Sequence, residues 1–284
     1  MRAQIPTGTL TEVMGFGRNP SGLAMHLYVP TRIAGRPAIL VAVHNCTSSG
    51  PEFFAATEFA QLADSHGFIV VYPTATRPGS CYDVSSPETL RNGGGSDSAA
   101  IVSMVEYVTR HGGDPERVYV TGASSGAMMT NVLLGAYPDV FQAGAPFMGV
   151  PFGCFATFDG SSWNSDCADG RIVKTAREWG DLVRAAYPGF AGTRPRVQLW
   201  HGTEDDILRY PNLDESVKQW TDVLATGERP CLVDHPEPGW TRTRFGTADP
   251  WAPVEAISLR GFGHDLPNPG MARRTIEFFG LTAD

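Results

Sequence analysis

The amino-acid sequence predicts an α/β fold in which a mostly parallel central sheet is covered by helices on both faces. Short apolar runs rich in Val, Ile and Leu lack the polar alternation of half-exposed strands, so both of their faces are expected to be buried. Helical patterns lie between these runs, and such alternation is typical of βαβ units. The expected strands span residues 24–29, 38–44, 68–72, 117–121, 196–201 and 254–260. The expected helices span residues 52–66, 98–111, 125–137, 173–187, 214–225 and 271–279.

Several of these helices carry boundary signals. Asp97 follows a run of three glycines and is expected to cap the helix that begins near Ser98. Gly67 follows one helical pattern, and Gly112 with Gly113 follows another. Glycine at these positions fits a helix C-terminus.

The domain organisation is expected to be simple. Residues 147–170 have little periodicity and are interpreted as a long ordered loop tied by a Cys154–Cys167 bridge. Residues 228–253, rich in Gly and Pro, are interpreted as another excursion over the surface. Because no internal repeat or long linker is visible, residues 1–284 are expected to form a single domain.

Composition and charge exclude several classes of partner. The chain has 284 residues, of which 42% are hydrophobic and 18% charged, and its net charge is −8. This acidity, without a basic cluster, argues against binding to nucleic acid or to an anionic membrane. No apolar run approaches the roughly 18 residues of a membrane-spanning helix. We therefore expect a globular protein. We also expect it to be a monomer.

Five cysteines bear on the cellular compartment. Cys46, Cys81, Cys154 and Cys167 lie in loop-like sequence, and Cys231 follows a proline in a separate loop. None forms a C-x-x-C pair, and the histidines lack metal-site spacing, so neither a metal nor a cofactor is expected. Two disulfides plus one unpaired cysteine are favoured over five thiols in a cytosolic enzyme, which implies an oxidising compartment. Because the chain begins without an apolar signal region, a secreted form is expected to have lost its signal peptide.

The sharpest chemical signal is a G-x-S-x-G motif from Gly122 to Gly126, between the expected strand 117–121 and the helix that starts at Ser125. A sharp turn between strand and helix exposes the hydroxyl of Ser124, and the small flanking residues permit close backbone approach. The helix N-terminus places the Ser125 N–H where an oxyanion would form. The context favours a nucleophilic serine over a Gly/Ser turn without function, and it predicts an α/β-hydrolase fold.

A nucleophilic serine requires a base and an acid, which in this fold follow it along the chain. Asp205 and Asp206 come just after the strand 196–201, and the residues alone do not choose between them. His264 follows the last strand in a Gly- and Pro-containing loop, which favours a catalytic base over a core histidine.

A second oxyanion donor is expected in the loop 43–51, although this stretch also fits an ordinary Ser/Gly loop. The glycines at 93–95 lack the spacing and the lysine of a phosphate-binding loop, so they are interpreted as a helix entry.

Together these motifs resemble carbohydrate esterase family 1, most closely its secreted acetyl xylan esterases; feruloyl esterases and polyhydroxybutyrate depolymerases are relatives. The matching stretches run through most of the chain, at residues 16–20, 44–47, 81–86, 93–98, 120–132, 149–154, 163–167, 187–189, 201–205 and 263–264.

The resemblance implies a serine nucleophile, Ser124, a general base, His264, and Asp205 as the acid. It implies an oxyanion hole made by the backbone N–H groups of Cys46 and Ser125. It also implies two disulfides, Cys46–Cys81 and Cys154–Cys167, with no counterpart for Cys231.

Three residues depart from the family pattern, namely Asn45, Phe152 and Trp200. Phe152, Trp200 and Trp163 are candidate stacking surfaces for a sugar or an aromatic group, and Asn45 is a further candidate substrate contact. We expect a secreted serine esterase that removes acetyl groups from xylan. The alternatives are a feruloyl esterase, a polyester hydrolase and, more distantly, a non-catalytic binding module on a hydrolase fold.

Overall fold

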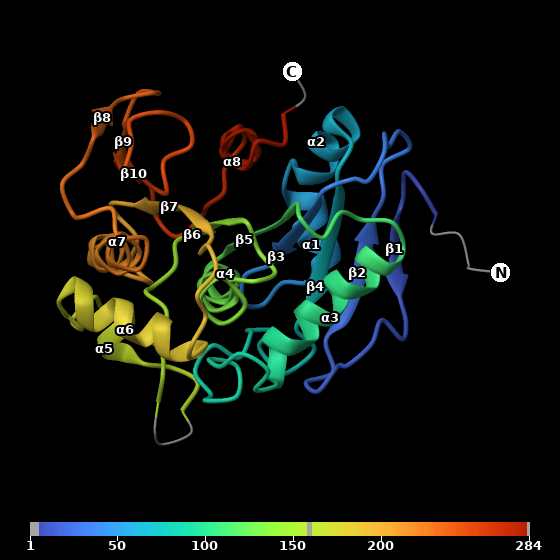
Figure 1. The fold of residues 1–284 in the computed structure, drawn as a ribbon, viewed down its shortest axis with the longest axis horizontal. Helices are drawn as coiled ribbons and strands as arrows, with labels where there is room; N and C mark the ends of the chain where they lie inside the picture. The colour runs from blue at the N-terminus through green and yellow to red at the C-terminus, as the bar shows by residue number, and fades with distance from the viewer. Residues whose placement is uncertain (1–5, 158–160, 283–284) are drawn as a thin grey trace.

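One sheet runs through the computed structural model, which describes residues 6–157 and 161–282. Over these residues the sheet has ten strands in the order β1-β2-β4-β3-β5-β6-β7-β10-β9-β8 (Figure 1). The pairs between β4, β3, β5, β6, β7 and β10 are parallel, whereas β1, β2, β9 and β8 pair antiparallel at the two edges. The mostly parallel sheet is therefore confirmed. The strands are β1 (Leu10–Val13), β2 (Ala24–Tyr28), β3 (Ile39–Val43), β4 (Ile69–Thr74), β5 (Val118–Ala123), β6 (Ala143–Phe147), β7 (Arg196–Gly202), β8 (Leu232–Asp234), β9 (Trp240–Phe245) and β10 (Val254–Leu259).

Helices cover both faces of this sheet. The helices are α1 (Gly50–Ala56), α2 (Phe59–His66), α3 (Ser96–Arg110), α4 (Ser125–Ala136), α5 (Ser165–Ala168), α6 (Ala176–Ala186), α7 (Pro211–Val223) and α8 (Met271–Phe279). In Figure 1, α2 and α8 lie above the strands and α4 and α6 lie below them. Two apolar clusters result, one on each side of the sheet.

The central strand β3 shows how the two clusters arise. Its five residues are all buried. Successive side chains of a strand point to opposite faces, so complete burial means that both faces of β3 are covered. Val41 packs in the cluster that holds Trp220 of α7, whereas Leu40 packs in the cluster that holds Phe279 of α8. A strand buried on both faces reads as a continuous apolar run, which is why it was predictable.

Four strands were not predicted. β1, β8 and β9 pair antiparallel near the sheet edges and carry polar or exposed residues, so they lack the apolar signal. β6 has the sequence Ala-Gly-Ala-Pro-Phe, in which Gly and Pro disfavour a strand, yet it is wholly buried between β5 and β7. Tertiary pairing overrides the local preference there.

Two helix boundaries also differ from expectation. The predicted helix 52–66 is divided into α1 and α2, because the chain leaves helical geometry at Thr57, whose hydroxyl bonds the carbonyl oxygen of Phe53. The prediction that Asp97 caps α3 is wrong. Gly95 occupies the N-cap position, and Asp97 lies inside the first turn with its side chain fully buried. Gly67, by contrast, is the left-handed C-cap of α2, as predicted.

Both expected disulfides are present, Cys46–Cys81 and Cys154–Cys167, and Cys231 is free and exposed. The second bridge ties the loop before α5, although residues 158–160 of that segment lie outside the described residues. No helix in the described ranges has the length and apolar character needed to span a bilayer.

The Cys154–Cys167 bridge closes a loop with a sequence separation of 13 residues. Closing a loop of about that length removes roughly 3 kcal/mol of unfolded-chain entropy at 25 °C. We expect the double substitution Cys154→Ala/Cys167→Ala to lower the free energy of unfolding in urea by about 2–4 kcal/mol. Cys231→Ser is the matched control and should change it by less than about 0.5 kcal/mol. Equal unfolding midpoints for the two proteins would contradict the expectation.

Candidate active site

Ser124 lies at the turn between β5 and α4 in a strained backbone conformation. Its φ of 55° and ψ of −116° belong to a region that residues other than glycine rarely adopt. Its N–H is held by the carbonyl oxygen of Phe147 in β6 at 3.0 Å. The neighbouring residues of β5 and α4 are buried, whereas Ser124 is partly exposed. The turn therefore presents its hydroxyl at the carboxyl end of the sheet, as the motif predicts.

The two glycines of the motif allow this turn to approach β3. A Cβ atom on Gly126 would lie 2.2 Å from the carbonyl oxygen of Val43 and 2.5 Å from that of His44. A Cβ on Gly122 would lie 2.5 Å from the carbonyl oxygen of Gly126. These contacts are to backbone atoms, which cannot swing aside. The first turn of α4 thus packs directly on the end of β3, beside the loop that carries Cys46.

The structure brings Ser124, His264 and Asp205 into one chain of hydrogen bonds. His264 Nε2 is 2.8 Å from Ser124 Oγ, and His264 Nδ1 is 2.8 Å from Asp205 Oδ2. An ionised carboxylate can only accept, so Nδ1 carries the proton and Nε2 accepts from the hydroxyl. An imidazole held this way can remove a proton from the serine.

The Asp205 carboxylate is fixed from several sides. Its side chain is fully buried, and Oδ1 accepts the N–H groups of Ile207 at 3.0 Å and Leu208 at 2.8 Å. Burial opposes its ionisation, but hydrogen bonds from His201 and His264 outweigh burial and hold the pKa of this carboxyl well below its usual range. Asp206 is exposed. The structure therefore distinguishes the buried Asp205, which contacts His264, from the exposed Asp206, although the residues alone do not choose between them.

His201 is a second buried imidazole at this carboxylate, and the sequence did not single it out. Its Nε2 donates to the carbonyl oxygen of Leu208 at 2.7 Å and lies 3.3 Å from Asp205 Oδ2. It ends the apolar run of β7, where a histidine looks like an ordinary core residue. The available signal was the stretch 201–205 that resembles the family, which begins at His201 and ends at Asp205.

The candidate oxyanion donors lie at a helix terminus and in the neighbouring loop. Ser125 is the first residue of α4, so no intrahelical carbonyl can accept its N–H. The Cys46 N–H belongs to the same peptide group as the Asn45 carbonyl. His44 Nδ1 donates to that carbonyl oxygen at 2.6 Å. His44 Nε2 in turn accepts the N–H of Ala75 at 3.1 Å. Burial lowers the pKa of His44 and so favours the neutral ring that these two bonds require.

The four candidate substrate contacts are placed very differently. Trp200 is 1% exposed, stacks on Phe147 and donates from Nε1 to Gln198, so it offers no surface to a ligand. Phe152 is 4% exposed and packs against Gly135 of α4. The expectation that Trp200 and Phe152 are stacking surfaces is therefore wrong: both are core residues.

Asn45 and Trp163 remain candidates. Asn45 is partly buried and its amide donates to the Cys46 carbonyl oxygen at 2.9 Å. Trp163 is 49% exposed, contacts Phe155 edge to face, and lines a cavity of about 820 Å³ together with residues of α5 and α6. Among the described residues, no group of three or more His, Cys, Asp or Glu side chains is arranged to hold a metal ion.

Known proteins resemble this chain over nearly its whole length. Residues 23–221 match the family model described as esterase PHB depolymerase. Feruloyl esterase B of Thermothelomyces thermophilus is 42% identical over 277 residues, which cover 96% of this chain and 93% of that protein. Acetylxylan esterase A of Aspergillus oryzae is 41% identical over 288 residues, covering 99% and 92%.

Solved structures agree with the fold. The acetyl xylan esterase from Aspergillus awamori superposes with a TM-score of 0.91 at 37% identity, and covers 97% of this chain and 100% of its own. The serine hydrolase FphF of Staphylococcus aureus, with a TM-score of 0.62 and 14% identity over 98% of this chain and 100% of its own, shares the fold alone. The protein is thus a carboxylic ester hydrolase with the α/β-hydrolase fold, and the chain belongs to the esterase PHB depolymerase family.

Proposed function

We propose that this protein is a secreted serine esterase that removes acetyl groups from xylan. The observation that carries the proposal is the hydrogen-bonded series Ser124 Oγ, His264 Nε2, His264 Nδ1 and Asp205 Oδ2. A hydroxyl, an imidazole and a buried carboxylate in this order match the groups that acyl transfer through a serine requires. The strained conformation of Ser124 adds support, since strain of this kind gathers at reacting residues.

In the proposed reaction Ser124 Oγ attacks the ester carbonyl carbon while His264 Nε2 takes the serine proton. The N–H groups of Cys46 and Ser125 stabilise the oxyanion of the tetrahedral intermediate. As this intermediate collapses, the carbon–oxygen bond to the sugar breaks and His264 returns the proton to the sugar oxygen. Water, deprotonated by His264, then attacks the acyl carbon. The bond from that carbon to Ser124 Oγ breaks, His264 returns the proton to Oγ, and the carboxylic acid leaves. Asp205 keeps the imidazole in the required tautomer throughout.

The choice of acetyl over feruloyl rests on the comparisons. The structural neighbour with a TM-score of 0.91 is an acetyl xylan esterase. The sequence relatives include acetylxylan and feruloyl esterases at similar identity, so a feruloyl esterase is the second candidate. Trp163 offers an exposed aromatic face beside a cavity of about 820 Å³, and we propose that a polysaccharide chain stacks there.

The proposed setting follows from the cysteines. Disulfides persist in oxidising compartments, and two are present here, which supports an extracellular enzyme. We further propose that residues 1–284 act as one catalytic domain and as a monomer, with neither nucleic acid nor membrane as a partner.

Ser124→Ala should abolish turnover of p-nitrophenyl acetate, with kcat reduced at least about 10⁴-fold, because no nucleophile remains. A fluorophosphonate should label the unchanged protein once, at Ser124, and leave the variant unlabelled, as read by mass spectrometry. Ser65→Ala, on the exposed face of α2, is the control and should react normally. A non-catalytic binding module would show neither turnover nor labelling.

The adjacent carboxylates Asp205 and Asp206 form a matched pair. Asp205→Asn should lower kcat by about 10⁴-fold, because an amide cannot hold the imidazole in the required tautomer. Asp206→Asn should leave kcat within about twofold, since surface substitutions of this kind have small effects. Steady-state kinetics on one acetyl ester compare the two, and equal losses would overturn the assignment of Asp205.

The substrate proposal predicts faster acetate release from acetylated xylan than ferulate release from feruloylated arabinoxylan. Both products can be followed by chromatography at equal enzyme concentration, with Ser124→Ala as the blank. If ferulate release is the faster reaction, the feruloyl esterase assignment replaces the acetyl one.

A further inference from the structure

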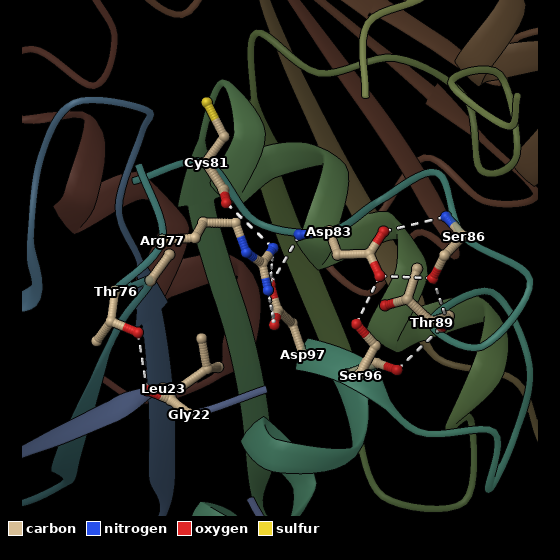
Figure 2. A network of polar contacts seen from close by, with 12 residues as sticks. Gly22, Leu23, Thr76, Arg77, Cys81, Asp83, Ser86, Thr89, Ser96 and Asp97 are labelled. Atoms are coloured by element: carbon tan, nitrogen blue, oxygen red, sulfur yellow. Dashed lines mark hydrogen bonds and ion pairs between the residues drawn. The ribbon is translucent and has the colours of Figure 1, made fainter. Parts of the chain in front are cut away.

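Asp97 is a fully buried carboxylate that the proposed reaction does not use. It lies in the first turn of α3 and forms a bidentate ion pair with Arg77, at 2.6 Å from Nη2 to Oδ1 and 2.8 Å from Nη1 to Oδ2 (Figure 2). The two side chains come from different parts of the fold, because Arg77 follows β4. The fork geometry fixes the direction of the guanidinium as well as its position.

The pair also holds the segment from Arg77 to Asp83 at two points. Arg77 Nη1 donates to the Cys81 carbonyl oxygen at 3.3 Å, and the Asp83 N–H donates to Asp97 Oδ2 at 2.7 Å. The Asp83 carboxylate accepts the Ser96 hydroxyl at 2.5 Å, which fastens the segment to the start of α3 (Figure 2). One buried carboxylate thus organises the backbone on both sides of Cys81.

The other side of the same segment is joined to the loop that carries Cys46. Cys81 forms the disulfide with Cys46, and the Thr47 N–H donates to the Gly79 carbonyl oxygen at 2.8 Å. The segment that the Arg77–Asp97 pair holds is therefore joined to the loop that carries Cys46 by one disulfide and one backbone hydrogen bond.

Stability alone is a poor explanation for this pair. A buried ion pair costs desolvation, and well-packed apolar residues often stabilise a fold equally well. A bidentate pair does give directional rigidity, and oxyanion donors must be held to within about 0.5 Å of their productive position. His44 fixes the plane of the Cys46 peptide, while the bridge to Cys81 fixes where the loop stands relative to α3.

We propose that Arg77 and Asp97 are positioning residues for the oxyanion donor Cys46, acting through the Cys81–Cys46 bridge. This inference rests on the proposed function, in which the Cys46 N–H binds the oxyanion. Neither side chain touches the substrate in this scheme. Because an oxyanion forms only during the reaction, a displaced donor lowers kcat and leaves KM nearly unchanged.

The experiment measures kcat and KM for p-nitrophenyl acetate in Asp97→Asn and Arg77→Lys. We expect kcat to fall about 10- to 100-fold in each variant. Complete removal of one oxyanion donor costs about 10²- to 10³-fold, so a displaced donor should cost no more than that. KM should stay within about twofold, and the pH midpoint of kcat/KM should not move, because His264 and Asp205 are untouched. Asp234→Asn breaks another bidentate ion pair, the more exposed one with Arg242 at β8 and β9, and should leave kcat unchanged. If one variant fails to fold, the other supplies the same comparison.

The route through the bridge is tested in a second background, Cys46→Ser/Cys81→Ser, which retains the residue-46 N–H. Compared with that protein, the protein that also carries Asp97→Asn should have a kcat lower by less than about threefold. The reason is that the effects of coupled residues are not additive. An equal loss with and without the bridge would overturn the proposal, and so would a lower melting temperature with unchanged kcat. Ser124→Ala measured in the same series reports separately on the proposed function, because its loss of turnover does not depend on how Cys46 is held.

Discussion

The contact between the first turn of α4 and the end of β3 is the constraint on which the site depends. Gly126 and Gly122 let peptide groups meet at distances that no Cβ could occupy. That contact places the Ser125 N–H beside the Cys46 loop, and it forces Ser124 into a conformation that turns its hydroxyl away from the sheet. Because β3, β5, β7 and β10 are parallel, their carboxyl ends meet at one edge of the sheet. Asp205 follows β7 and His264 follows β10, so both residues lie at that edge.

Buried polar groups then fix each part of this edge. His44 orients the Cys46 peptide, the Ile207 and Leu208 N–H groups hold Asp205, and Asp97 organises the segment that is bridged to Cys46. The side chains of His44, Asp205 and Asp97 are almost inaccessible to water and have hydrogen-bond partners, which makes such networks rigid. In the proposed reaction, such a site would meet the developing charge with dipoles that are already in place, so little reorganisation would be needed.

The predictable parts of the fold are those in which a local signal coincides with the tertiary environment. β3 and β5 are buried on both faces, so their apolar runs are continuous, and the turn at Ser124 has a five-residue motif. β6 could not be predicted, because Gly and Pro disfavour a strand and only its two neighbours in the sheet hold it in place. Trp200 and Phe152 were misjudged for a related reason: an aromatic residue beside a motif has the same local signal whether it faces a ligand or the core.

The sequence by itself determined the α/β class, the motif serine and the loops that carry the proposed base and acid, because periodicity and glycine spacing are local properties. The family resemblance added the choice of Asp205 and the Cys46–Cys81 pairing, whereas the Cys154–Cys167 bridge was already expected from the loop that holds both cysteines. Tertiary structure decided what depends on distant residues meeting: the burial of Asp205 beside His201 with Asp206 left exposed, and the pairing of Asp97 with Arg77 instead of a helix cap. A carboxylate in a first helical turn can cap its own helix or bind a distant guanidinium, and only the packing of α3 against the segment after β4 chooses between the two.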